Sequence, residues 1–96
     1  MGAKVLVTVE FLGLPRRLSG QTEAQIEVRE GATLRDVVVE LARLFPSFIG
    51  QVITPQADNL ISPYFFNVGG RLTATSLAQT VDPGEPLVLM FLEAGG

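Results

Sequence analysis

The end of the chain could do chemistry through its backbone alone. The tail Glu93-Ala94-Gly95-Gly96 directly follows an apolar run, Leu87 to Leu92. A glycine pair has no side chains, so it can enter a narrow slot and present its α-carboxylate. We therefore expect residues 93–96 to form a flexible tail whose reactive group is the carboxylate of Gly96.

The composition excludes most other chemistry. The chain has no cysteine and no histidine, which excludes disulfides, thiolate catalysis, zinc sites built from Cys or His and a histidine general base. The carboxylates of Glu10, Asp36, Glu40, Asp58 and Asp82 are spread over turns and outward faces without evident pairing. We therefore expect no metal site, no permanently bound cofactor and no catalysis by this chain itself.

Charge and hydropathy limit the partners. The net charge of -3 argues against nucleic-acid binding, which requires a basic patch. The mean hydropathy of +0.37 is high, yet the longest apolar run is far shorter than the roughly 18 residues that span a bilayer. The start of the sequence fits neither a secretory signal nor a myristoylation site. We expect a cytoplasmic protein without a membrane partner, whose surplus apolar residues either fill the core or meet a protein.

Residues 5–28 predict two strands. Residues 5–12 alternate, with Val5, Val7, Val9 and Phe11 on one face, and residues 23–28 alternate again. The connection, residues 13–20, has the composition of a turn. The two strands should therefore pair as a hairpin.

A helix is predicted from Thr33 to Pro46. Thr33 is a suitable N-cap, Asp36 suits the first turn, and Pro46 marks the end. An apolar stripe runs along one side of this helix: Leu34, Val37, Val38, Leu41, Ala42, Leu44 and Phe45. Prolines break any period in the next segment, residues 46–63, where a short helical turn near Phe48 is the only expectation.

The remainder predicts three more strands. Residues 64–68 should form one strand, and Gly69-Gly70 a tight turn to a short return strand at 71–73. Leu77 and Val81 should fill the core before a turn at 82–85. The final strand, residues 87–92, is apolar on both faces, so either residues 46–63 or a protein partner must cover its second face. The candidate partner contacts are Phe66, Leu72, Met90, Phe91 and Leu92, with Arg71 at the rim.

This order of elements predicts the fold class. Strand, strand, helix, strand, short strand and strand give a mixed sheet packed on one main helix, an α+β domain of two layers. The length of 96 residues indicates a single domain spanning residues 1–96.

Three segments give the chain a family resemblance. The segments are the strand-to-helix junction at residues 30–37, the hairpin at residues 66–71, and the turn, last strand and tail at residues 82–96. Together they resemble the ubiquitin-like β-grasp proteins, and more narrowly the sulfur-carrier family of the molybdopterin-synthase small subunit (MoaD) and its thiamine-pathway relative (ThiS). The hairpin departs from the family pattern, because Val68 and Gly69 separate Asn67 from Gly70.

The resemblance implies a carrier function. In this family an activating enzyme uses ATP to adenylate the terminal carboxylate, which sulfur then converts to a thiocarboxylate. The tail enters an acceptor enzyme, here expected to be the large subunit of molybdopterin synthase, and donates sulfur to the pterin precursor. By this resemblance Gly96 is the reactive residue, and Glu93, Ala94 and Gly95 contact the partner.

Three other functions remain open. The carrier could serve thiamine or another sulfur pathway. It could instead be a ubiquitin-like modifier that is joined through Gly96 to target lysines, or a plain β-grasp interaction module whose Gly-Gly pair is incidental.

Overall fold

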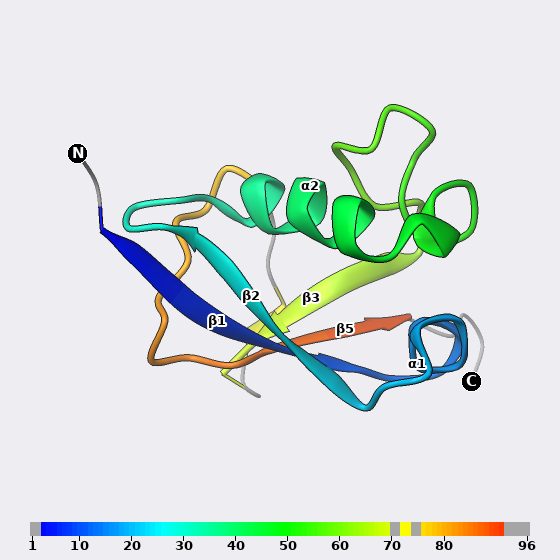
Figure 1. Ribbon diagram of the computed structural model, residues 1–96, viewed down its shortest axis with the longest axis horizontal. Coiled ribbons are helices and arrows are strands. Elements are labelled where there is room, and N and C mark those ends of the chain that lie inside the picture. Colours follow the sequence, from blue (N-terminus) through cyan, green and yellow to red (C-terminus); the bar gives the residue numbers. More distant parts are fainter. Residues whose placement is uncertain (1–2, 70–71, 74–75, 92–96) are drawn as a thin grey trace.

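The computed structural model describes residues 3–69, 72–73 and 76–91. A five-stranded sheet forms one layer, and helix α2 packs across one of its faces (Figure 1). The strand order is β2-β1-β5-β3-β4. The strands are β1 (Lys4–Phe11), β2 (Glu23–Arg29), β3 (Tyr64–Val68), β4 (Leu72–Thr73) and β5 (Leu87–Phe91), and the helices are α1 (Leu14–Ser19), α2 (Leu34–Leu44) and the 3-10 turn η1 (Pro46–Phe48). The predicted α+β, β-grasp fold is confirmed.

Strands β1 and β2 form the predicted antiparallel hairpin, but their connection was predicted incorrectly. Residues 14–19 form the short helix α1, not a plain turn. Pro15 lies in its first turn, where the missing N–H costs nothing, and Gly20 ends it in the left-handed conformation at φ 72°. Pro15 is buried, so this helix closes one end of the core.

Strand β5 is central, and its neighbours decide which side chains face inward. It runs parallel to β1, with Val9 opposite Leu87 and Phe11 opposite Leu89. Since β1 buries its odd-numbered residues, Leu87 and Leu89 are buried too, with exposed fractions of 2% and 0%. Val88 and Met90 therefore point to the other face of the sheet, which we call the outer face.

Helix α2 begins and ends as predicted. Thr33 is its N-cap, and the Asp36 carboxylate accepts hydrogen bonds from the Thr33 N–H at 2.8 Å and the Thr33 hydroxyl at 3.2 Å. Most of the apolar stripe is buried against the sheet. The placement of Leu44 on that stripe was wrong, because its side chain is 42% exposed.

The segment at residues 46–63 packs on the helix side of the sheet. Phe48 is fully buried, and its ring meets Phe11 edge-on at a centroid distance of 5.5 Å. The Arg35 guanidinium on α2 donates a hydrogen bond to the Asp58 carbonyl at 2.8 Å. Figure 1 shows this green segment beside α2. It thus extends the helix layer and, among the described residues, does not cover the outer face.

Two smaller expectations were met in the connection to β5. Val81 is 8% exposed and Leu77 packs against the core.

Among the residues that the structure describes, no helix has the length and apolar character to cross a membrane.

Candidate functional site

An apolar patch occupies the β5–β3 side of the outer face. Val88 and Met90 of β5 lie beside Asn67 and Phe65 of β3, respectively. Leu12 extends the alternation of β1, and its N–H donates to the Leu89 carbonyl at 3.2 Å, which brings it next to Met90. The patch consists of Leu12, Phe65, Val88 and Met90, and we call it the outer apolar patch. Leu12 is 38% exposed and the other three are half-buried.

The β1–β2 side of the same face is mixed, with Leu6 of β1 56% exposed among polar side chains. The Thr8 hydroxyl donates to the Gln25 side-chain oxygen at 3.2 Å, and the Lys4 ammonium lies 3.4 Å from the Glu27 carboxylate. Both residues of that ion pair are largely exposed, so it contributes at most about 1 kcal/mol. The outer apolar patch is therefore bordered by charge on one side, an arrangement typical of protein interaction surfaces.

One buried side-chain atom in the described part of this face lacks a hydrogen-bond partner. The side-chain oxygen Oδ1 of Asn67 is buried and accepts no hydrogen bond. A buried acceptor without a donor costs roughly 1–3 kcal/mol. Asn67 lies directly opposite Val88, so this unsatisfied group borders the outer apolar patch.

The structure separates the predicted contact residues. Met90 lies on the outer face as half-exposed apolar surface. Phe91 is 47% exposed, but it shares the parity of Leu89 and its ring lies 5.6 Å from that of Tyr64, at the end of the helix-covered face. The assignment of Phe66 to the interface was wrong. It is 1% exposed and opposite the inward-facing Leu89, so its ring belongs to the core.

The other predicted site residues lie outside the described part of the chain. These residues are Arg71, Leu92, Glu93, Ala94, Gly95 and Gly96. Leu72 is placed by its backbone alone, in β4 opposite Val68. Their roles stay predictions.

Phe65, Val88 and Leu12 were not among the predicted contacts. The sequence did contain a signal for them in the alternation of β1, where Thr8 and Glu10 mark the outward parity. To know which residues of β5 face outward, one must know that Phe11 pairs with Leu89. To know the same for β3, one must know that Phe65 pairs with Met90. These registers join segments more than 20 residues apart and are not readable from local patterns.

The acidic side chains that the structure describes are dispersed. No group of three or more acidic side chains in this part of the chain could hold a metal ion. A hydrogen bond to the Glu40 carboxylate, together with its negative charge, raises the pKa of the Arg43 guanidinium above its ordinary value. The pair lies where α2 borders β2, with the Arg43 side chain exposed and the Glu40 side chain half-buried.

The sheet order, the mixed pairing and the single crossing helix define the ubiquitin-like β-grasp fold. Solved structures bear this out. The chain is similar to SAMP1 of Haloferax volcanii, with a TM-score of 0.79 and 19% identity over 95% of this chain and 99% of that one. Its similarity to the small archaeal modifier protein 1 of Methanosarcina acetivorans has a TM-score of 0.77 and 16% identity, covering 99% and 100% of the two chains.

A third similar structure has a different name. It is a protein of Pyrococcus furiosus assigned as subunit 1 of a molybdopterin converting factor, with a TM-score of 0.69 and 27% identity over 88% of this chain and 94% of that one. No model of a known protein family matches the chain, and no curated protein sequence does.

Proposed function

We propose that the chain is a carrier or modifier that works through the carboxylate of Gly96. The observation that supports this most is the position of the tail in the sequence. Residues 92–96 directly follow β5, the central strand that contributes Val88 and Met90 to the outer apolar patch. A partner bound to this patch would thus lie within a few residues of the glycine pair.

The chemistry would be supplied by an activating enzyme that uses ATP. The Gly96 carboxylate attacks the α-phosphorus of ATP, pyrophosphate leaves, and an acyl adenylate forms. Hydrosulfide, HS⁻, then attacks the acyl carbon and displaces AMP, and loss of its proton leaves a thiocarboxylate. A carboxylate is a poor electrophile until it carries such a leaving group, and holding the reactants together supplies much of the acceleration. The carrier needs no catalytic side chain for any of these steps.

The binding energy for this reaction would come from the sheet. Ordering each residue of a flexible tail costs roughly 1–2 kcal/mol, and two glycines offer little surface in return. We propose that the outer apolar patch docks on the activating enzyme and the acceptor, because interfaces concentrate their energy in a few buried apolar anchors.

Our preferred acceptor is the large subunit of molybdopterin synthase, with this chain as the small subunit that delivers sulfur to the pterin precursor. The 27% identity to the Pyrococcus furiosus protein supports this choice. The similarity to SAMP1 structures favours a second candidate, a modifier joined through Gly96 to lysines of other proteins. Sulfur carriers of the thiamine or another pathway use the same chemistry and stay alternatives.

Intact-mass spectrometry of the protein purified with its activating enzyme separates the candidates. A carrier gains the mass that corresponds to one oxygen replaced by sulfur at the C-terminal carboxylate. A modifier instead appears as an amide-linked adduct of larger proteins, and a plain interaction module keeps its unmodified mass. The last result would refute the proposal.

A variant of the tail is compared with a matched control. A chain extended by one residue beyond Gly96, and shown not to be trimmed, should fold normally and fail to be charged. Exchanging the exposed Arg16 of α1 for Gln alters a side chain outside the proposed contacts, keeps the length and should leave charging intact. Normal charging of the extended chain would show that the Gly96 carboxylate is not the reactive group.

A further inference from the structure

Strand β2 is an edge strand, and half of its backbone N–H and C=O groups point away from the sheet. Among the residues that the structure describes, it has one neighbour in the sheet, β1. Its pairing with β1 is antiparallel, and the Phe11 N–H donates to the Thr22 carbonyl at 2.8 Å. Antiparallel pairs alternate between bonded and non-bonded residues, so the even-numbered residues of β2 direct their N–H and C=O groups at β1. The odd-numbered residues, Glu23, Gln25, Glu27 and Arg29, direct theirs away from the sheet.

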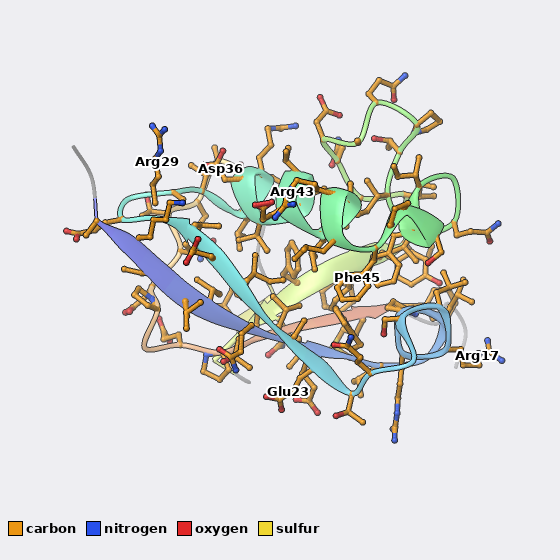
Figure 2. The ribbon with its side chains drawn as sticks, viewed as in Figure 1. Arg17, Glu23, Arg29, Asp36, Arg43 and Phe45 are labelled. Atoms are coloured by element: carbon orange, nitrogen blue, oxygen red, sulfur yellow. The ribbon has the colours of Figure 1, made fainter. Side chains whose placement is uncertain are left out.

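The two ends of this strand also carry charges that β1 does not balance. Glu23 lies directly opposite Glu10, and Arg29 lies directly opposite Lys4. Like charges directly opposite each other on a sheet are destabilising. Lys4 is paired with Glu27, while the described residues give neither Glu23 nor Arg29 an ion-pair partner. Figure 2 shows these two side chains at opposite ends of β2.

We propose that β2 pairs antiparallel with β2 of a second copy of this chain, giving a symmetric dimer with a two-fold axis at Ile26. In this register Glu23 of each copy lies opposite Arg29 of the other, and Gln25 lies opposite Glu27. These are the odd-numbered residues whose backbone groups are free, so each such pair can exchange backbone hydrogen bonds. Each unbalanced charge at an end of β2 then gains the opposite charge across the seam.

Neighbouring registers are unfavourable. A shift of the axis to Gln25 places Glu23 opposite Glu27 in both halves. A shift the other way, to Glu27, places Glu27 opposite its own copy. Both arrangements set carboxylates against one another, whereas charged edge strands commonly serve to prevent unwanted pairing. The charge order of β2 therefore favours this register over the two registers beside it.

The surface beside β2 has room for a second copy. An open groove runs between β2 and α2, lined by Val28, Glu40, Arg43 and Leu44, among others. Leu44, which is 42% exposed, also lines the continuation of this groove beside Ala24. In the proposed register Ala24 lies opposite Val28 of the second copy. That side chain would approach Leu44 and cover apolar surface that the isolated chain leaves exposed.

The dimer would leave the proposed docking surface accessible. The seam is formed by β2, and β1 separates it from β5 and the outer apolar patch. The two copies would join their sheets into one of ten strands with a patch on each half. Dimerisation and partner binding can therefore be tested separately, and a result against one proposal does not affect the other.

A charge-exchange cycle tests the proposal by sedimentation velocity over a range of protein concentrations. The wild-type chain should dimerise as its concentration rises. Arg29→Glu alone and Glu23→Arg alone each set like charges across both ends of the seam, so each should weaken the dimer by about tenfold or more. The double variant E23R/R29E restores opposite charges and should recover most of the lost affinity.

Two further variants separate the seam from other causes. Arg17→Glu makes the same charge change on α1 and should leave dimerisation unchanged. Gln25→Pro removes an N–H that points away from β1, which an edge strand tolerates, and should abolish the dimer. A wild-type chain that stays monomeric up to roughly 1 mM would overturn the proposal. So would a double variant that dimerises no better than either single variant.

Discussion

The two faces of the sheet are built from the same strands but carry different residues. On the inner face, Val9, Phe11, Phe66, Leu87 and Leu89 are buried almost completely under α2 and η1. On the outer face, Met90 and Phe65 are apolar too, yet they stay half-exposed. One helix layer can cover one face, so apolar residues on the other face add little to the fold. Their presence is better explained by a partner than by stability.

The largest expected change in stability comes from comparing an inner-face residue of β5, Leu89, with the adjacent outer-face residue, Met90. Leu89→Ala should destabilise the fold by about 2–5 kcal/mol, because it opens a cavity in a filled core. Met90→Ala removes a similar volume from the open face and should cost less than half as much. Denaturant unfolding of both variants measures the ratio. Equal losses would show that the outer face is covered after all.

The same comparison applies to α2. Leu41 is fully buried and Val39 is 48% exposed on the opposite side of the helix. Leu41→Ala should cost about 2–5 kcal/mol, whereas Val39→Ala should change the unfolding free energy by no more than about 0.5 kcal/mol. An unmoved denaturation midpoint in the Leu41 variant would mean that the core is assigned to the wrong side of α2.

A charge introduced on the outer face should weaken partner binding without unfolding the protein. Met90→Glu places a carboxylate in the middle of the outer apolar patch. Affinity for the activating enzyme or acceptor should fall by about tenfold or more, since a hot spot contributes at least about 2 kcal/mol. Thr8→Glu adds the same charge on the β1–β2 side and should change affinity much less. Titration calorimetry with a purified partner compares them, and unchanged binding by the Met90 variant would exclude the patch.

The sequence predicted the inner face better than the outer one. Local periodicity was enough to place the alternation of β1 and the start of α2 at Thr33, because the residues involved are neighbours in the chain. It was insufficient for β5, where every residue is apolar and parity depends on pairing with β1. The error at Phe66 has the same origin, since its face is decided by Leu89, 23 residues later. The helix α1 was missed because Pro15 and two flanking glycines have the composition of a turn.

Removing the N-terminal cap of α2, the helix that covers the inner face, should destabilise the fold by a smaller amount. The Asp36 carboxylate accepts hydrogen bonds from the N–H and hydroxyl of Thr33, which fixes the helix end that covers the inner face. Asp36→Ala should cost about 1 kcal/mol, the usual loss for a helix-capping interaction. Glu40→Ala, on the same helix, removes a half-buried carboxylate whose i,i+3 ion pair with the exposed Arg43 contributes little, and should cost less. A midpoint shift that is equal in both variants would argue against the cap.

The smallest expected effect comes from a mutation that stabilises the fold. The Asn67 side-chain oxygen is buried without a hydrogen-bond donor, and asparagine is disfavoured in strands. Asn67→Val removes that acceptor and adds a β-branched residue, so it should stabilise the fold by about 0.5–1 kcal/mol. The buried oxygen is out of reach of a docked partner, so the same variant should bind that partner with little change in affinity. Unfolding and binding measurements on one preparation test both expectations. A variant that is destabilised would show that Asn67 makes interactions that contribute to the fold.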